Sequence, residues 1–317
     1  MSPTILVAGA TGNTGRSATE TLSKLIQAPD SPLHNHRILA LTRSADSPAA
    51  QHLAVLPGVE VIEQNWVEIT SEWLQTHHVV RAFIASQSKV SHFAEESTFH
   101  LALLNAGVKY VVRISTGAAF ARANATAYNA RGHWAIEALL SAPEFKALHW
   151  TSLQPNAFCT FWFSPAVEFI KEYRTTGRAD SVLRLMVPKD CAVGVIDPAE
   201  VGVVAAHLLV QEDTTKHTGR RYVLNGPEDI SGENIVQMIE RTIGVTVQNV
   251  RYGDLSALDA FLEKGHMGSG NSRNVIWSIR RAAETAWEFK APPTSKEVLE
   301  LAAPKRTPQQ MLGSLLE

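Results

Sequence analysis

VAGATGNTGR, residues 7–16, continues the apolar run Ile5–Ala8 and leads into a segment compatible with a helix. Here Gly9 allows a sharp turn, Gly12 lets the backbone approach phosphate oxygens, and Gly15 lets the helix pack closely on the strand. The free amides at such a helix start carry positive partial charge that binds phosphate. The spacing is G-x-x-G-x-x-G instead of G-x-G-x-x-G, and glycines also make ordinary turns. The apolar run before the glycines, the helix-compatible segment after them and their place near the N-terminus nevertheless predict a dinucleotide site.

The composition is typical of a globular chain of one or two domains, with 317 residues, 45% hydrophobic and 19% charged. The net charge of −2 provides no basic excess for a nucleic-acid backbone. Two cysteines, Cys159 and Cys191, are too few for a disulfide framework and indicate a reducing compartment. No apolar segment reaches the roughly 18 residues of a membrane span, and no targeting segment is evident. We therefore expect a cytoplasmic protein without a membrane partner.

Apolar runs rich in Val and Ile alternate with helix-compatible segments through the first half of the chain. Such runs are typical of parallel strands that are covered on both faces. Repeated strand–helix units predict an α/β fold with a doubly wound parallel Rossmann sheet. Strands are expected at Ile5–Ala8, Arg37–Leu41, Val59–Glu63, Val79–Ala85, Tyr110–Ser115 and Leu148–Leu153, and helices at 15–27, 45–55, 91–106 and 128–142.

The second half predicts a smaller α+β domain. Residues 1–155 are expected to form the NADP-binding domain, with 191–225 returning to it, and residues 156–190 and 226–317 the substrate domain. Thr294–Glu297 and Thr307–Gln310 resemble capping boxes, and 265–274 is a loop candidate. The other expected elements are helices at Ser164–Tyr173, 198–210 and Ser231–Ile243, and strands at Cys191–Ile196, Arg220–Asn225 and Val245–Tyr252.

The end of the second expected strand discriminates between NAD and NADP. An acidic residue there would bind the ribose diol of NAD, but the sequence reads Leu41-Thr42-Arg43-Ser44. A guanidinium and a hydroxyl suit the additional phosphate of NADP(H), and Arg16 could close on the same phosphate. The alternative is that Arg43 and Arg16 are simply solvated.

The chain resembles the NmrA-like group of atypical short-chain dehydrogenases/reductases. The resemblance implies a Rossmann cofactor domain, a smaller and mostly C-terminal substrate domain, and a site in the cleft between them. The group includes isoflavone-reductase-like and quinone-reductase-like enzymes, and also regulators that bind the cofactor as a redox signal. The matching segments are ILVAGATGNTGR (5–16), LTRS (41–44), AGVKYVVRIST (106–116), GHWAIEALL (132–140), WTSLQPNAF (150–158), CAVGVIDPAEVGVVAAHLL (191–209) and YVLNGPEDISGENI (222–235).

The resemblance also implies which residues hold the cofactor. Gln154 stands where the group usually has an arginine, so one charged contact is missing. Asn65 stands in place of the usual Asp beside adenine. The implied contacts are Gly9, Thr11, Gly12, Asn13, Thr14 and Gly15 at the pyrophosphate, Arg43 and Ser44 at the 2′-phosphate, Asn65 and Trp66 at adenine, Ala85 and Ser86 at the ribose, and Ser115, Thr116, Pro155, Asn156 and Phe158 at the nicotinamide.

The usual proton-transfer residues are incomplete. Ordinary short-chain reductases use Ser and Tyr-x-x-x-Lys, in which the lysine lowers the tyrosine pKa. Ser115 and Tyr128 are candidates, but Gly132 stands at the lysine position, and no lysine lies between 109 and 146. Three possibilities stay open. Tyr128 donates the proton, tuned by Arg131 or His133; His133 acts alone; or no acid exists. No metal-ligand spacing is present.

Four aromatic residues, Phe158, Phe161, Trp162 and Phe163, follow the sixth expected strand and suit either a flat apolar substrate or packing between domains. We expect an NADPH-dependent oxidoreductase that transfers hydride to a small, largely apolar carbonyl, enone or quinone. The alternative is a non-catalytic NADP(H)-sensing regulator that binds a protein partner; an isomerase or epimerase is a third possibility. The expected assembly is a monomer or homodimer.

Overall fold

A seven-stranded parallel sheet forms the larger lobe of the computed structural model, which describes residues 2–87, 89–266, 270–288, 290 and 292–317. The strand order β10-β6-β5-β4-β1-β2-β3 reverses between β1 and β4, as in doubly wound Rossmann folds. All six strands expected from the first half are present. The strands are β1 (Thr4–Ala8), β2 (Arg37–Thr42), β3 (Val59–Glu63), β4 (Val79–Ile84), β5 (Tyr110–Ile114), β6 (His149–Pro155) and β10 (Arg220–Leu224).

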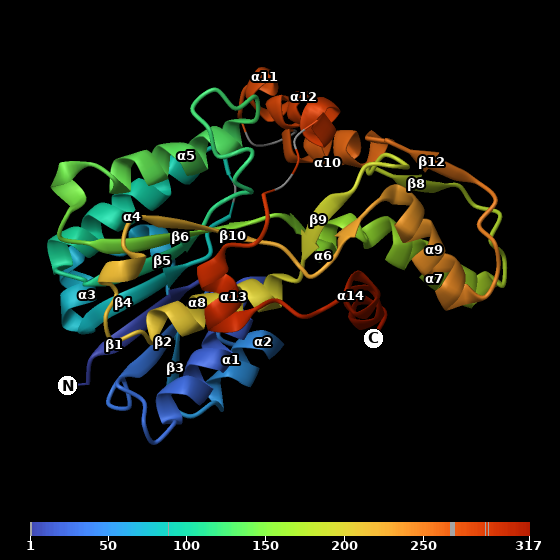
Figure 1. Cartoon of the computed structure of the whole chain (residues 1–317). Helices are drawn as coiled ribbons and strands as arrows, with labels where there is room; N and C mark the ends of the chain where they lie inside the picture. Colours follow the sequence, from blue (N-terminus) through green and yellow to red (C-terminus); the bar gives the residue numbers. More distant parts are fainter. Residues whose placement is uncertain (1, 88, 267–269, 289, 291) are drawn as a thin grey trace.

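Helices cover both faces of this sheet (Figure 1). One face carries α1 (Asn13–Gln27), α2 (Pro48–Ala54), α8 (Pro198–Leu209) and α13 (Lys296–Ala302), and the other α3 (Ser71–Thr76), α4 (His92–Ala106) and α5 (Tyr128–Leu140). Helix α1 packs tightly on α8 because Gly202 has no side chain; an added Cβ there would lie 2.3 Å from the Thr14 carbonyl oxygen.

The smaller lobe is built on two short sheets. One consists of β7 (Ala157–Phe158), β9 (Val193–Ile196) and β11 (Asp229–Ile230), and the other of β8 (Leu183–Leu185) and β12 (Val250–Tyr252). Of the segment 191–225, α8 and β10 therefore lie with the large sheet and β9 with a small one. The lobe's helices are α6 (Cys159–Trp162), α7 (Ser164–Thr176), α9 (Gly232–Ile243), α10 (Ser256–His266), α11 (Arg273–Ile276), α12 (Ser278–Thr285) and α14 (Pro308–Leu315).

Several local predictions needed correction. The strand expected at Val245–Tyr252 is only β12, because its partner β8 has three residues. The expected strand Cys191–Ile196 begins at Val193. The expected loop 265–274 contains the end of α10 and the start of α11, and its residues 267–269 lie outside the described residues.

The two predicted capping boxes had different outcomes. The box at Thr307–Gln310 is formed, with the Thr307 side chain accepting from the Gln310 amide. The box at Thr294–Glu297 is not, because Ser295 is the N-cap and makes no capping bond. Its hydroxyl instead accepts from the Val223 amide at 2.9 Å, which ties the chain to β10. None of the helices in the described parts of the chain is long and apolar enough to cross a membrane.

Candidate functional site

The glycine turn connects β1 to α1 and has the close contacts that its sequence predicted. Gly9 has φ +83°, and a Cβ there would lie 2.8 Å from the Ala85 carbonyl oxygen. A Cβ on Gly15 would lie 2.0 Å from the Gly9 carbonyl oxygen, so any side chain at residue 15 would disrupt the turn. Gly12 is exposed and is the N-cap of α1, whose first turn has no acidic residue. The turn therefore presents bare backbone amides to an anion.

A groove of about 390 Å³ opens beside this turn, at the carboxyl ends of β1 to β4. Seven of the residues expected to hold a cofactor line it: Gly9, Thr11, Gly12, Arg43, Asn65, Trp66 and Ala85. Sequence reasoning missed Lys89 and Glu95, which also line this glycine-turn groove. Only their position after β4 in the sequence could have indicated that these two residues line the groove. Other expected residues do not line it: Asn13, Thr14, Gly15, Arg16, Ser44 and Ser86.

The end of β2 leaves a cation facing the groove. The Thr42 hydroxyl donates to the Ser44 carbonyl at 3.0 Å and accepts from the Ser44 amide at 3.2 Å, which fixes the turn that carries Arg43. Arg43 is exposed and forms no ion pair within the described residues. Arg16 is differently placed, since its side chain lies 3.8 Å from Glu20 on α1 and is 59% exposed. Trp66 is held edge-on against Phe99, with ring centroids 5.7 Å apart.

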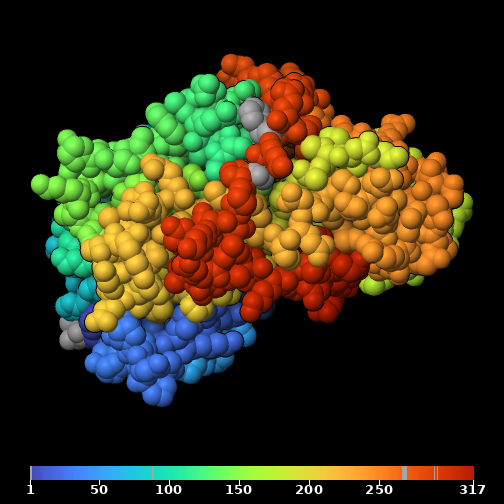
Figure 2. Space-filling model, viewed as in Figure 1, coloured from blue at the N-terminus to red at the C-terminus, as the bar shows by residue number. Residues whose placement is uncertain are grey.

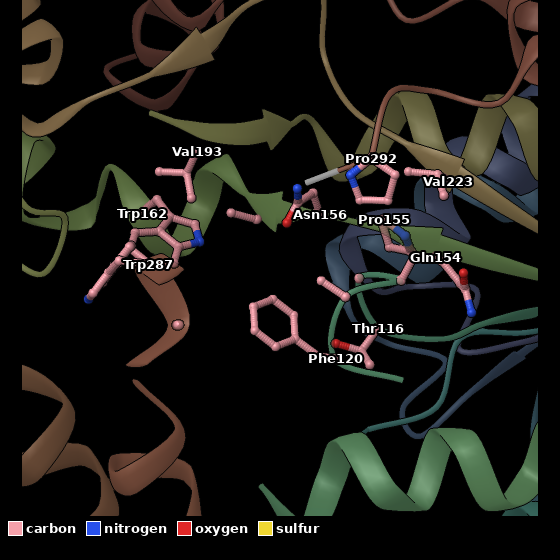
Figure 3. Close-up of a pocket in the computed structure, with 15 residues that line it drawn as sticks. Thr116, Phe120, Gln154, Pro155, Asn156, Trp162, Val193, Val223, Trp287 and Pro292 are labelled. Carbon is pink, nitrogen blue, oxygen red and sulfur yellow. The ribbon is translucent and has the colours of Figure 1, made fainter. Parts of the chain in front are cut away.

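A second cavity, of about 160 Å³, lies at the carboxyl ends of β5 and β6 (Figure 3). Thr116, Pro155 and Asn156 line one end, and Trp162 and Trp287 line the other. None of the described residues that line this aromatic cavity is titratable. Its wall also includes Gly117, Ala118, Ala119, Phe120, Gln154, Ala157, Val193, Val223, Ala286 and Pro292.

The four aromatic residues after β6 separate in the structure. Trp162 lines the cavity, Phe161 is 47% exposed, Phe163 is buried in the smaller lobe's core, and Phe158 packs against the core beneath α1 and α8. Sequence reasoning missed Trp287, because nothing in the sequence around the short helix Ala286–Glu288 indicates that its tryptophan lines a cavity.

Gly194 on β9 is a further residue that the sequence did not single out. A Cβ there would lie 2.9 Å from Asn156 Nδ2 and 2.6 Å from Asn225 Oδ1. The absence of a side chain at residue 194 therefore makes room for both amides beside the cavity. Asn225 is buried, and its Oδ1 finds no hydrogen-bond partner within the described residues.

The structure places the candidate acids away from the lining of both cavities. Tyr128 begins α5 and packs against Met186 and Leu258 of the smaller lobe, and burial raises the pKa of its phenol. Arg131 donates to the carbonyls of Ala125 and Thr126. Ser115 is buried, and its hydroxyl has no partner within the described residues.

His133 is also buried, and it contacts Arg113. Arg113 Nη2 donates to His133 Nδ1 at 2.9 Å, so the neutral ring carries its proton on Nε2. Burial and the Arg113 guanidinium hold the pKa of His133 well below its ordinary value. This imidazole is therefore uncharged near neutral pH.

Arg113 and His133 belong to a buried polar network beneath α4 and α5. The carboxylate of Glu96 accepts from Arg113 Nε at 2.5 Å and from the Ser86 hydroxyl at 2.6 Å. Burial raises the pKa of Glu96, but Arg113, His100 and His92 outweigh it and hold that pKa well below its ordinary value. Ser86 directly follows Ala85, so the network anchors the loop that forms one wall of the glycine-turn groove.

The network continues through the protein to its surface. Arg113 Nη1 donates to Ser152 at 3.0 Å, and Ser152 donates to Glu137 at 2.7 Å. Glu137 also accepts from the half-exposed Arg221 at 2.9 Å. Gln154, at the cavity wall, donates to the same carboxylate. No group of His, Cys, Asp and Glu in the described ranges could hold a metal ion.

The chain is similar to known proteins in its sequence pattern and in its fold. The model of the NmrA-like family matches residues 1–281. An Escherichia coli NADPH-dependent quinone oxidoreductase, complexed with NADPH, is 20% identical with a TM-score of 0.71, over 99% of this chain and 100% of that one. Citrobacter sp. triphenylmethane reductase, complexed with NADP(H), is 18% identical with a TM-score of 0.72, over 98% and 100%.

A third structural relative is not described as an enzyme. NmrA, a negative transcriptional regulator in complex with NAD, is 16% identical with a TM-score of 0.64, over 100% of this chain and 95% of that one. No curated protein sequence matches the chain. At such identities the solved structures show a shared fold and leave the chemistry to the site itself.

Proposed function

The chain belongs to the NmrA-like family, and we propose that it is an NADPH-dependent oxidoreductase acting on a small, largely apolar carbonyl, enone or quinone. The observation that carries the proposal is the pairing of two cavities along one edge of the large sheet. The glycine-turn groove follows β1 to β4, and the aromatic cavity follows β5 and β6. In doubly wound folds this carboxyl edge is where ligands bind.

The residues of the groove fit a dinucleotide. The cradle at Gly9, Gly12 and Gly15 keeps side chains away from the amides at the α1 N-terminus, where a pyrophosphate would bind. Trp66 and Asn65 offer a flat apolar surface and an amide for the adenine. When bound, the reduced cofactor would supply the hydride. Thr116, Pro155 and Asn156 line the cavity end that would hold its nicotinamide.

The cation at the end of β2 favours NADP(H) over NAD. Arg43 faces the groove without a competing ion pair in the described structure, and Lys89 lines the same groove. A guanidinium binds phosphate through paired charge-assisted hydrogen bonds. The related quinone oxidoreductase and triphenylmethane reductase bind NADPH or NADP(H), whereas the related regulator binds NAD.

The uncharged lining of the aromatic cavity favours an acceptor that needs no enzymatic acid. A quinone fits this requirement, because hydride addition gives a stabilised phenolate that solvent can protonate. Tyr128, His133 and Ser115 are retained as candidate proton donors, but their burial and contacts suit supporting roles better. The rings of Phe120, Trp162 and Trp287 suit a flat apolar substrate.

The same lining also supports a second candidate function. A cavity without a titratable side chain in the described residues, combined with Gly132 in place of a catalytic lysine, suits a protein that binds NADP(H) and turns nothing over. In that case the bound cofactor would signal redox state to a protein partner.

Anaerobic mixing of the protein with NADPH and a panel of quinones and enones tests the proposal. We expect the nicotinamide absorbance band to decay in proportion to the acceptor that is added. Saturable NADPH binding without decay for any acceptor would reject the enzyme and favour the sensor. A sensor should also bind NADP⁺ and NADPH with different affinities while consuming neither.

A further inference from the structure

One end of the aromatic cavity is closed by two tryptophans from distant parts of the chain. Trp162 comes from α6 and Trp287 from the short helix Ala286–Glu288. Their rings pack edge to face, with centroids 5.3 Å apart and planes at 76° (Figure 3). The opposite end is formed by Thr116 and Pro155, at the carboxyl ends of β5 and β6. Trp287 therefore faces the space left between the proposed nicotinamide end and the smaller lobe.

The segment that carries Trp287 is hydrogen-bonded at Trp287 and again at residues that follow it. Cys191 Sγ donates to the Trp287 carbonyl at 3.5 Å. Farther along, the Pro292 carbonyl accepts from Asn225 Nδ2 at 2.8 Å, and the Thr294 hydroxyl accepts from the Asn225 amide at 3.0 Å. These contacts hold the described residues 286–288 and 292–295 against β9 and β10. Together with the ring contact to Trp162, these bonds support the position of Trp287 at the cavity.

This segment lies outside the part of the chain that the family model matches, which ends at residue 281. It leads into α13, which packs on α8, and then α14, which packs on the smaller lobe's core. Figure 2 shows these C-terminal residues, in red, crossing the surface between the two lobes. One wall of the cavity is therefore supplied by residues that the family pattern does not specify.

The size of the cavity limits what can enter beside Trp287. Its volume of about 160 Å³, which includes the end proposed for the nicotinamide, is close to that of a cavity of roughly 150 Å³ that accommodates benzene, so the space beside Trp287 is small. Phe120 and the two tryptophans offer flat faces to an acceptor. Because Trp287 closes this end, we expect a fused three-ring acceptor to meet its side chain and a single ring to avoid it.

We propose that Trp287 determines acceptor specificity by restricting the aromatic cavity to single-ring substrates. The inference rests on the proposed function, because it assigns the acceptor to the same cavity. A purely structural role for Trp287, as packing between the lobes, would affect stability and would leave the preference among acceptors unchanged.

The test compares Trp287→Ala and Trp287→Phe with the wild type and with Trp134→Ala. Trp134 is a matched control because it is 40% exposed on α5 and lies outside both cavities. The ratio of kcat/KM for phenanthrenequinone to that for para-benzoquinone is measured with NADPH. We expect Trp287→Ala to raise this ratio at least about tenfold, as a change of pocket size by several atoms should. Trp287→Phe should give an intermediate ratio and Trp134→Ala the wild-type ratio.

A binding experiment keeps this inference separate from the enzyme proposal. Equilibrium dialysis of the NADP⁺-loaded protein measures the affinities for phenol and phenanthrol, which accept no hydride. The wild type should favour phenol, and Trp287→Ala should shift the preference toward phenanthrol by about tenfold. A shift in relative affinity without turnover of any acceptor would support the inference that Trp287 limits the size of the ligand, and it would reject the proposed enzymatic activity. Unchanged binding and kinetic ratios in Trp287→Ala would overturn the inference even if the enzyme is active. If Trp287→Ala does not fold, Trp287→Leu must shift the ratios in the same direction.

Discussion

Arg113 Nε donates to Glu96 Oε1 at 2.5 Å, and both side chains are completely buried. The pair joins β5 to α4 behind the cofactor groove, and the hydroxyl of Ser86, which follows the groove-lining residue Ala85, donates to the same carboxylate. Taking two charges out of water is costly, and the cost is recovered only when their remaining hydrogen-bonding groups are satisfied. Here Ser152, His133 and His100 provide further partners. The groove is therefore supported by a network that should be sensitive to the loss of any charged member.

Replacing Glu96 tests this support. Glu96→Gln leaves the Arg113 charge without its buried carboxylate and should lower the free energy of unfolding by about 3–5 kcal/mol. Urea unfolding at neutral pH measures the change. The matched control is Glu60→Gln, because the Arg37–Glu60 ion pair is partly exposed and should contribute at most about 1 kcal/mol. Equal effects of the two substitutions would contradict the assigned role of the network.

The same network predicts a loss of stability at acidic pH. The pKa of His133 is lowered in the folded protein, so below an unfolded value of about 6.5 the unfolded chain binds more protons. The contribution of His133 to the free energy of unfolding is therefore complete above that pH and falls as the pH decreases. His100, whose pKa burial also lowers, acts in the same direction. The lowered pKa of Glu96 adds a further loss below its unfolded value, near 4.

Urea midpoints between pH 7.5 and 5, a range about the histidine pKa, check this dependence. The wild type should lose stability steadily toward pH 5, and His133→Asn should show a shallower slope because one buried titrating group is absent. A wild-type stability that is constant across this range would show that the histidines titrate alike in the folded and unfolded chain.

Arg43 should distinguish the two dinucleotides. Arg43→Ala removes the groove's cation at the end of β2 and should raise the Kd for NADPH by about 10- to 100-fold, as the loss of a charge-assisted phosphate contact does. The Kd for NADH should change little. Fluorescence titration measures both. Arg178→Ala serves as the control, since Arg178 is exposed and paired with Asp180. A proportional loss for both cofactors would show that Arg43 does not contact the 2′-phosphate.

Gly15 should tolerate no side chain. Gly15→Ala places a Cβ 2.0 Å from the Gly9 carbonyl oxygen and should abolish cofactor binding or folding. Gly313→Ala in α14 is the control, because its Cβ would meet nothing within 4 Å and should stabilise the helix slightly. Differential scanning fluorimetry with and without NADP⁺ separates loss of binding from loss of fold. Normal binding by Gly15→Ala would refute the assigned geometry of the turn.

The sequence predicted the sheet well because its strands are buried on both faces and so appear as apolar runs, as in Ile5–Ala8. The glycine turn could also be predicted, because its glycines are required by the backbone conformation and the close contacts of the turn. Arg113 within the apolar strand Tyr110–Ile114 was a signal of the buried network that could have been read. A charge in a covered strand requires a partner, yet nothing local identifies Glu96 as that partner.

The aromatic cavity was harder to predict because its walls come from segments far apart in the chain. The run Phe158–Phe163 indicated an aromatic site, but helix geometry at α6 points Trp162 into the cavity and buries Phe163 elsewhere. Trp287 reaches the cavity, and Gly194 approaches the cavity-lining Asn156, only through the packing of the lobes, which residue spacing does not encode. His133 was considered as an acid from its ordinary pKa, but burial and a contact between α5 and β5 lower that pKa in the folded protein.

Transfer of deuterium from NADPH labelled at nicotinamide C4 to an enone tests the central claim most directly. The product is analysed by mass spectrometry after anaerobic reaction with one face of the cofactor labelled at a time. The account predicts one deuterium per product molecule from one labelled face and none from the other. Unlabelled product from both forms, or saturable NADPH binding with no product from any acceptor, would contradict it.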